Sequence, residues 1–342
     1  MLLGLIVQFF YIQVFIIKIS KIGLLTFYFN YIIYSISIFF ENGDIIMENI
    51  KNKKWFDNVI WICIISYAIL IISEIIGGLL TSILVKGLFT SGLFKGNVYF
   101  YTFILYILSI YIWIVVLFVL LVFKNNHYII EKITTKTKGN NIAYLFLGLF
   151  IGFVLNGFCA LIAMINGDFT LRFSQFEIFP VIGLLFAVFV QSSAEELLCR
   201  GFMYQRLLKS TNCPAFVIIF NSLFFAALHL FNNGMSILPF YCIFIFGVFA
   251  SMLVYYFDSL WMAMGVHAMW NFTQSILLGL PNSGNNVPYS IFRIGSSVKG
   301  SFAYDPIFGL EGTILSSVLM TICCLVLYIW KSKKNKEEVV LN

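Results

Sequence analysis

Two adjacent carboxylates and an arginine lie in one of the most apolar parts of the chain. Glu195 and Glu196 are followed by Arg200, and residues 178–190 before them carry no charge. Charged side chains at membrane depth cost roughly 2.5 to 3.5 kcal/mol each on insertion scales, so they are usually retained for function. We therefore take these three residues as the centre of a candidate site.

Two further apolar segments contain a histidine. His229 follows Phe225 by four positions, and His267 precedes Asn271 by four. Residues four apart share one face of a helix, so each pair presents a short polar or aromatic face. A carboxylate, two imidazoles and an amide that converge can hydrolyse a peptide bond. The carboxylate deprotonates water, an imidazole positions that water, and N–H donors hold the developing oxyanion.

The segment 211–214 predicts a turn between two antiparallel helices. Glu195 and His229 lie equally far along the chain from Asn212, the centre of this turn. If both helices run unbroken, we expect the two side chains at matching depth. The basic tip of the hairpin should project into the cytoplasm, which places both side chains in the inner half of the bilayer.

The composition excludes a soluble globular domain. The 342 residues are 61% hydrophobic and 11% charged, whereas charged residues make up about a quarter of soluble domains. The net charge of +6 comes from lysine clusters beside apolar segments, a pattern that sets topology and does not indicate nucleic-acid binding. Seven cysteines without a CxxC spacing predict neither a disulfide framework nor a thiolate metal cage. The sequence predicts an all-α polytopic membrane protein within the lipid bilayer of the cell membrane.

Apolar segments long enough to span a bilayer predict an eight-helix transmembrane core. They are residues 59–84, 99–123, 142–165, 178–208, 215–231, 236–257, 260–278 and 308–330. Lysine clusters at 51–54, 124–138 and 331–336 fall on one side if the helices alternate, so both ends of the core are expected in the cytoplasm. Gly148 and Gly152 indicate close approach between two helices.

We divide the chain into four parts. Residues 1–46 form a hydrophobic N-terminal extension, and residues 47–177 contain the N-terminal transmembrane helices. Residues 178–279 form the catalytic core. An extracytoplasmic loop, the last transmembrane helix and a basic cytoplasmic tail make up residues 280–342.

The extension at 1–46 has two interpretations. Its apolar runs at 2–17 and 22–40 are typical of two extra membrane helices. Alternatively, Met47 is the true start, because a basic leader follows it at 48–54 and the codons for Gly43 and Asp44 can resemble a bacterial ribosome-binding sequence. Both interpretations stay open.

Together the three motifs resemble those of the CPBP family, the CAAX prenyl proteases and bacteriocin-processing enzymes also called the Abi family. The resemblance covers about 178–272 and rests on three segments in order: Glu195-Glu196-x-x-x-Arg200-Gly201, Phe225-x-x-x-His229 and His267-x-x-x-Asn271. Cys199 departs from the pattern, since an aromatic residue is common before the arginine.

The resemblance implies an eight-helix intramembrane endopeptidase whose site opens toward the cytoplasm. It implies the following roles: Glu195 as the general base, His229 as the holder of the water, Glu196 as the partner of Arg200, His267 with Asn271 as the oxyanion donors, and Phe225 as a substrate or packing residue. The substrate would be a peptide or protein in or near the membrane. Eukaryotic relatives cleave prenylated CAAX tails, and bacterial relatives are linked to bacteriocin maturation or self-immunity. Abundant Ile, Asn, Lys and Phe indicate a low-GC bacterium, so a prenylated substrate is not expected.

Two other functions remain open. The first is a non-catalytic immunity or scaffold protein that keeps the fold and binds a peptide. The second is a transporter, since intramembrane carboxylates and histidines also line ion pathways. The absence of an inverted repeat and of a Gly/Pro-broken helix pair disfavours the transporter.

Metal dependence is also open. A catalytic zinc usually takes three protein ligands and keeps one position for water, and the candidates are His229, His267 and Glu195. However, no HExxH helix is present, and Glu195 would be a poor base if it bound the metal. We therefore expect metal-free catalysis, with zinc as the alternative cofactor.

Overall fold

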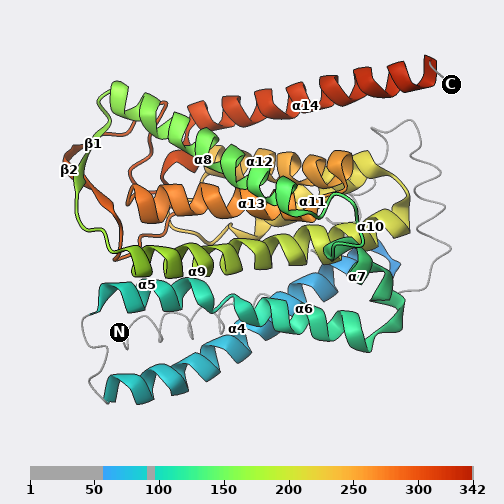
Figure 1. Cartoon of the computed structure of the whole chain (residues 1–342), viewed down its shortest axis with the longest axis horizontal. Coiled ribbons are helices and arrows are strands. Elements are labelled where there is room, and N and C mark those ends of the chain that lie inside the picture. The colour runs from blue at the N-terminus through green and yellow to red at the C-terminus, as the bar shows by residue number, and fades with distance from the viewer. Residues whose placement is uncertain (1–56, 91–96, 341–342) are drawn as a thin grey trace.

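The computed structural model describes residues 57–90 and 97–340. It is an elongated bundle of helices in which α9 (Ile178–Glu196) runs through the middle, between α13 (Leu260–Asn271) and α5 (Val98–Ile107) (Figure 1). The expected extra helices within 1–46 and the start at Met47 lie outside the described residues.

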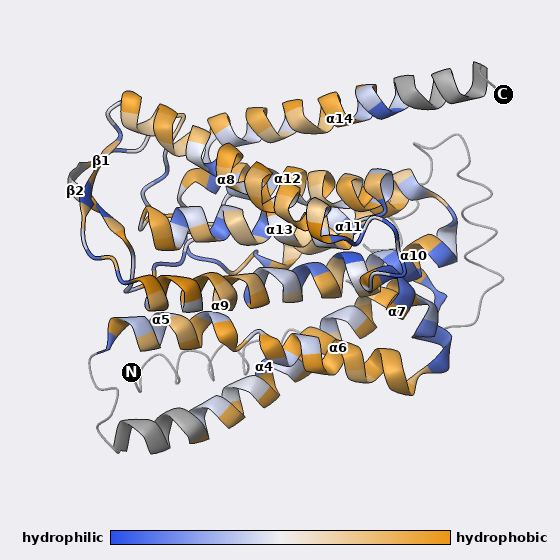
Figure 2. Ribbon diagram, in the orientation of Figure 1, coloured by the Kyte–Doolittle hydropathy of each residue, from blue (hydrophilic) through white to orange (hydrophobic). Residues whose placement is uncertain are grey.

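Six helices of the described chain are long and apolar enough to cross a membrane. They are Val59–Ile83, Val98–Val122, Ile142–Ile165, Ile178–Thr211, Ile237–Phe257 and Ile314–Ser332. Apolar residues cover most of their length, while hydrophilic residues gather near α7 (His127–Ile133) and α10 (Tyr204–Thr211) and near the two strands (Figure 2). The chain is therefore an all-α polytopic membrane protein, as the composition predicts.

Two of the eight expected spans, 215–231 and 260–278, are not among these six, and three expected spans differ from uniform α-helices. α11 (Pro214–Leu228) ends three residues before the expected limit at 231. α13 changes at Phe272 into a π-helical segment, Phe272–Leu277. The expected span 99–123 is interrupted, because α5 ends at Ile107 and α6 (Ile110–Val122) begins after a turn. Apolar runs fix which residues are helical but do not reveal these local interruptions.

The turn that joins the first two motif segments is confirmed. α10 ends at Thr211, and Asn212 adopts a left-handed conformation with φ of 52°. Asparagine tolerates this conformation, which often ends a helix. Pro214 then begins α11, where its missing N–H costs nothing because the first N–H groups of a helix have no intrahelical partner.

Glycines let α8 (Ile142–Ile165) pack closely on α13, as predicted. A Cβ atom at Gly148 would lie 2.3 Å from the carbonyl oxygen of Met262, and one at Gly152 would lie 2.3 Å from that of Val266. Real Cβ atoms do not come so close, so both positions require glycine. This packing holds α13, which carries His267, against the rest of the bundle.

A two-stranded antiparallel sheet lies at the end of the bundle opposite α7 and α10 (Figure 1). It pairs β1 (Phe169–Phe173) with β2 (Phe292–Val298). Between α13 and β2, residues 279–285 form an inward loop that is tied to the helices. Gln274 donates from Nε2 to the Pro281 carbonyl at 2.6 Å, and Asn232 donates from Nδ2 to the Ser283 carbonyl at 2.9 Å. α12 (Ile237–Phe257) and α14 (Ile314–Val340) complete the bundle.

Candidate active site

A buried ion pair anchors the first motif. Arg200 and Glu196 are both fully buried, and Nη1 of the arginine donates to Oε1 of the carboxylate at 3.0 Å. The expected pairing is present, but the guanidinium is shared and not bidentate to Glu196. Nη2 donates to the Gly247 carbonyl at 3.1 Å, and the guanidinium carbon lies 4.3 Å from the centre of the Phe225 ring. Arg200 thus joins α9, α12 and α11.

The helix that carries this pair is not α-helical throughout. Leu197–Met203 forms a π-helical segment between α9 and α10. The i→i+5 pattern loosens the backbone ladder and often marks functional sites. Here Asn221 of α11 donates from Nδ2 to the Cys199 carbonyl at 2.8 Å. The residue that departs from the family pattern therefore supplies a backbone oxygen that holds α11 in place.

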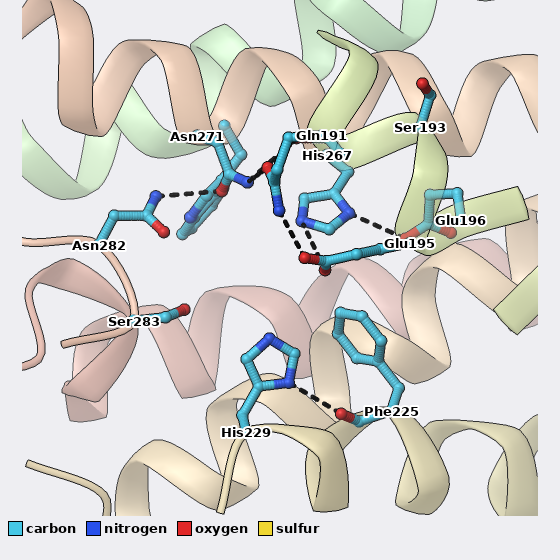
Figure 3. Close-up of polar contacts among 12 residues, drawn as sticks. Gln191, Ser193, Glu195, Glu196, Phe225, His229, His267, Asn271, Asn282 and Ser283 are labelled. Carbon is cyan, nitrogen blue, oxygen red and sulfur yellow. Dashed lines mark hydrogen bonds and ion pairs between the residues drawn. The ribbon is translucent and has the colours of Figure 1, made fainter. Parts of the chain in front are cut away.

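His267 lies between the two carboxylates. Its Nδ1 is 2.9 Å from Glu196 Oε1, and its Nε2 is 3.9 Å from Glu195 Oε2. Since an ionised carboxylate can only accept, Nδ1 carries the proton and donates to Glu196. The opposite nitrogen is thereby directed at Glu195 and at the space beside it (Figure 3).

Glu195 is the accessible member of the pair. Its side chain is 26% exposed, whereas that of Glu196 is 0% exposed. Its Oε1 accepts a hydrogen bond from Nε2 of Gln191, one helical turn earlier. Oε2 faces His267 Nε2, so this carboxylate has an oxygen directed at the space where the three motifs meet. The two glutamates therefore differ in exposure, while their separate roles stay a prediction.

His229 faces Glu195 across the same space (Figure 3). It caps the C-terminus of α11, and its Nδ1 lies 2.9 Å from the Phe225 carbonyl oxygen. A carbonyl only accepts, so Nδ1 is the protonated nitrogen, and in the neutral ring Nε2 carries the lone pair. His229 can therefore accept a hydrogen bond from a water molecule beside Glu195.

Phe225 packs among the charged and aromatic groups of the site. Its ring meets those of His229 and His267 edge to face, with centroids 4.9 Å and 6.0 Å apart, and Arg200 lies over its face. Such contacts add roughly 0.5 to 1.5 kcal/mol beyond area burial. Phe225 thus contacts both histidines of the site and the guanidinium of the buried ion pair.

Asn271 takes part in a chain of amides. Its Nδ2 donates to Gln191 Oε1 at 3.2 Å and to Ser192 Oγ at 3.1 Å. Its Oδ1 accepts from Asn282 Nδ2 of the inward loop at 3.0 Å. The structure therefore brings Asn271 to the site, but it directs the donor group of Asn271 to α9.

The inward loop is fixed by a partly buried carboxylate that sequence reasoning missed. Glu311 accepts from the Trp270 indole N–H at 2.9 Å, from the Ser283 backbone N–H at 2.9 Å, and from the Ser283 hydroxyl. Burial raises the pKa of Glu311, while the hydrogen bonds from Ser283 and Trp270 partly oppose that rise. This carboxylate holds Ser283 and its neighbour Asn282 against the site.

Gln191 could have been found from the sequence, since it precedes Glu195 by four positions and shares its helical face. No comparable signal marks Asn282, Ser283 or Glu311. They lie 11 to 40 residues beyond Asn271. Asn282 and Ser283 fall in the expected extracytoplasmic loop and Glu311 in the expected span 308–330, and only the tertiary fold brings them to the site.

The residues do not fit a zinc site as they are arranged. Within residues 57–90 and 97–340, no three His, Cys, Asp or Glu side chains gather closely enough to hold a metal ion. Of the candidate ligands, Glu195 accepts a hydrogen bond from Gln191 on Oε1, and its Oε2 lies on the side of His267. We therefore derive no catalytic step through a metal.

The centre of this polytopic bundle thus holds a partly exposed carboxylate, two imidazoles and a buried ion pair. Residues 177–273 match the family model of type II CAAX prenyl endopeptidase Rce1-like proteins. This segment contains all three motifs and confirms the resemblance seen in the sequence, which supports an intramembrane protease in general. No curated protein and no solved structure matched the chain.

Proposed function

We propose that the protein is an intramembrane endopeptidase in which Glu195 activates the water that attacks the peptide bond. The observation that carries this proposal is the convergence of Glu195, His229 and His267 on one space (Figure 3). Glu195 has an oxygen directed into this space, and Nε2 of His229 can accept a hydrogen bond there. One water molecule held by these two groups would be positioned and activated at once.

In the proposed reaction Glu195 takes a proton from this water as the water oxygen bonds to the scissile carbonyl carbon. The negative charge that forms on the carbonyl oxygen needs an N–H donor. Nε2 of His267 can supply it when the ring carries both protons, a charge that Glu195 and Glu196 on either side would balance. Glu195 then returns its proton to the leaving nitrogen as the C–N bond breaks.

We further propose that the site opens toward the cytoplasm. The inward loop covers the end near the β-strands, where Asn282 contacts Asn271. The opposite end is formed by α7 and α10 (Figure 1), close to the lysine cluster at 124–138. Positive charge beside membrane helices marks the cytoplasmic side, so we expect a substrate to reach the site from that end. The substrate class we propose is a peptide or protein held in or near the membrane.

The decisive experiment compares Glu195→Gln with the wild-type protein in lipid nanodiscs. Peptides extracted from a bacterial membrane fraction serve as the substrate pool, and new chain termini are read by mass spectrometry. The amide keeps the volume of the carboxylate but cannot take a proton, so cleavage should fall about 10²- to 10⁴-fold. Glu177→Gln, an exposed carboxylate that precedes the same helix, should cleave like the wild type.

Three outcomes would overturn the proposal. Cleavage by Glu195→Gln at the wild-type rate would show that Glu195 is not the general base. Peptide capture without cleavage by the wild type would favour the immunity or scaffold function. Ion or proton flux in sealed liposomes that depends on Glu195, again without cleavage, would favour the transporter.

A further inference from the structure

Gln191 makes the one side-chain hydrogen bond that Glu195 has within the described chain. Its Nε2 donates to Glu195 Oε1, and its Oε1 accepts from Asn271 at 3.2 Å. Asn271 in turn accepts from Asn282 at 3.0 Å. Three amides in series thus connect the inward loop to the proposed base, as the dashed lines in Figure 3 show.

We propose that Gln191 is a positioning residue that fixes the orientation of the Glu195 carboxylate for proton transfer. This inference rests on the proposed function and deepens it. Gln191 lies on the same helix as Glu195, one turn earlier, so the two side chains keep the same relative position whatever the neighbouring helices do. Because Gln191 occupies Oε1, the oxygen that remains for water is Oε2, on the side of His267.

The ionised base dictates the direction of the whole amide series. A carboxylate only accepts, so Gln191 must present its N–H groups to Glu195 and its oxygen to Asn271. Asn271 must then present N–H groups to Gln191 and its oxygen to Asn282, which donates in turn. Every bond in the structure has this direction. A flipped amide at any position would place two oxygens or two N–H groups face to face.

The amide suits this position because it donates without adding charge. Glu196 and Arg200, which follow Glu195 along the chain, pair with each other. His267 of α13 and His229 after α11 face Glu195. Glu74, an exposed carboxylate of α4 (Val59–Thr90), also lies within electrostatic range. A further negative charge at position 191 would repel an ionised Glu195 and make its deprotonation harder.

The test measures kcat, KM and their pH dependence for Gln191→Leu and Gln191→Glu. The probe is a fluorescence-quenched synthetic peptide with the sequence that the wild type cleaves fastest in the membrane-fraction pool. Gln191→Leu removes the donor at similar volume. It should lower kcat about 10- to 100-fold, as expected for a lost hydrogen bond to a charged group, with KM changed less than about twofold. Gln191→Glu should move the acidic limb of the rate profile to higher pH.

A matched control separates positioning from stability. Asn140 is also a buried amide. It accepts from the backbone N–H of Leu260 and donates to the carbonyl of Lys132, at the other end of α13. Asn140→Leu should lower the thermal midpoint but leave the pH profile unchanged. If Gln191 has only a structural role, Gln191→Leu should also lower the thermal midpoint without changing the pH profile. Its cleavage rate should then return to the wild-type value at lower temperature.

The outcomes distinguish this inference from the proposed function. If Glu195→Gln is inactive while Gln191→Leu keeps the wild-type kcat and pH profile, Gln191 is not a positioning residue. If Glu195→Gln is itself active, the proposed function fails and the inference fails with it. Gln191→Glu keeps the side-chain volume. If Gln191→Leu does not fold, the acidic limb of the rate profile of Gln191→Glu tests the inference, and an unchanged limb contradicts it.

Discussion

The imidazole of His267 donates to Glu196 and not to the neighbouring Glu195. Its Nδ1 lies 2.9 Å from Glu196 Oε1, and its Nε2 is 3.9 Å from Glu195 Oε2. The fully buried Glu196 thus accepts hydrogen bonds from both His267 and Arg200. Two consecutive carboxylates thus have different surroundings: Glu196 is buried beside Arg200 and His267, and Glu195 is partly exposed.

This division predicts opposite effects of two conservative substitutions. Glu196→Gln leaves the fully buried Arg200 without its counter-charge, which is expected to destabilise the fold by about 3 to 5 kcal/mol. Glu195→Gln should leave stability nearly unchanged, because the residue is partly exposed and the amide keeps its volume. Thermal unfolding of the two variants in the same detergent checks this. Equal destabilisation by both would show that the two carboxylates share one structural role.

Arg200→Lys should be poorly tolerated. The guanidinium binds Glu196 with Nη1 and the Gly247 carbonyl with Nη2, while its plane covers Phe225. A lysine carries a single ammonium group, which cannot bind the carboxylate and the carbonyl and cover the ring at the same time. We expect a lower yield of folded protein and a lower thermal midpoint. Arg206→Lys is the matched control at the hairpin tip, where Arg206 pairs with Asp57 at 2.9 Å. If Arg200→Lys behaves like this control, Arg200 serves only as a positive charge that fixes topology.

Much of this arrangement could be predicted because it is local. The spacing of four between Glu196 and Arg200, and between Gln191 and Glu195, places each pair on one helical face whatever the tertiary fold. The apolar runs locate the membrane helices, and Gly148 and Gly152 indicate the close contact of α8 with another helix. These features depend on residues near one another in sequence or on composition alone.

The rest could not be predicted because it depends on partners far apart in the chain. The hydrogen bond of His267 to Glu196 spans 71 residues, and nothing in the sequence indicates which carboxylate receives it. The π-helical segment at Leu197–Met203 leaves no periodic signal in a uniformly apolar helix. Asn282 looks like an ordinary loop residue, and Glu311 falls at the start of the expected last span. Only the fold places Asn282 against Asn271 and Glu311 against Trp270 of α13.

Chelation should leave activity intact. The described side chains do not gather three metal-binding residues, and Gln191 already donates to Oε1 of Glu195. Dialysis of the purified protein against a strong chelator, followed by the cleavage assay and by metal analysis, checks this. Loss of activity together with stoichiometric zinc, and recovery of both on adding zinc, would make His229, His267 and Glu195 the ligands.

The proposed orientation predicts which end of the bundle is accessible from the cytoplasm. Lys136 and Ser174 are exposed. Lys136 follows α7 and Ser174 follows β1, and these two elements lie at opposite ends of the bundle (Figure 1). In intact cells a membrane-impermeant maleimide should label Ser174→Cys but not Lys136→Cys, and both should react after lysis. Labelling of the unsubstituted protein gives the background from its own cysteines, most of which are buried. The reverse labelling pattern would place the lysine-rich end outside and contradict a cytoplasmic opening.

The inward loop should be sensitive to pH through Glu311. Burial raises the pKa of this carboxyl above its usual 4.5, so the folded state favours the protonated form. The stabilising contribution of that protonated form is fully present below pH 4.5 and is lost as the pH rises through the raised pKa. Glu311→Gln cannot titrate. The difference in thermal midpoint, wild type minus Glu311→Gln, should therefore be largest at low pH and decrease toward neutrality. Asp305→Asn, at an exposed part of the same connection, is the control and should not reproduce that slope. A difference that stays flat or grows with pH would mean that Glu311 is held as a carboxylate and that the donors Trp270 and Ser283 outweigh its burial.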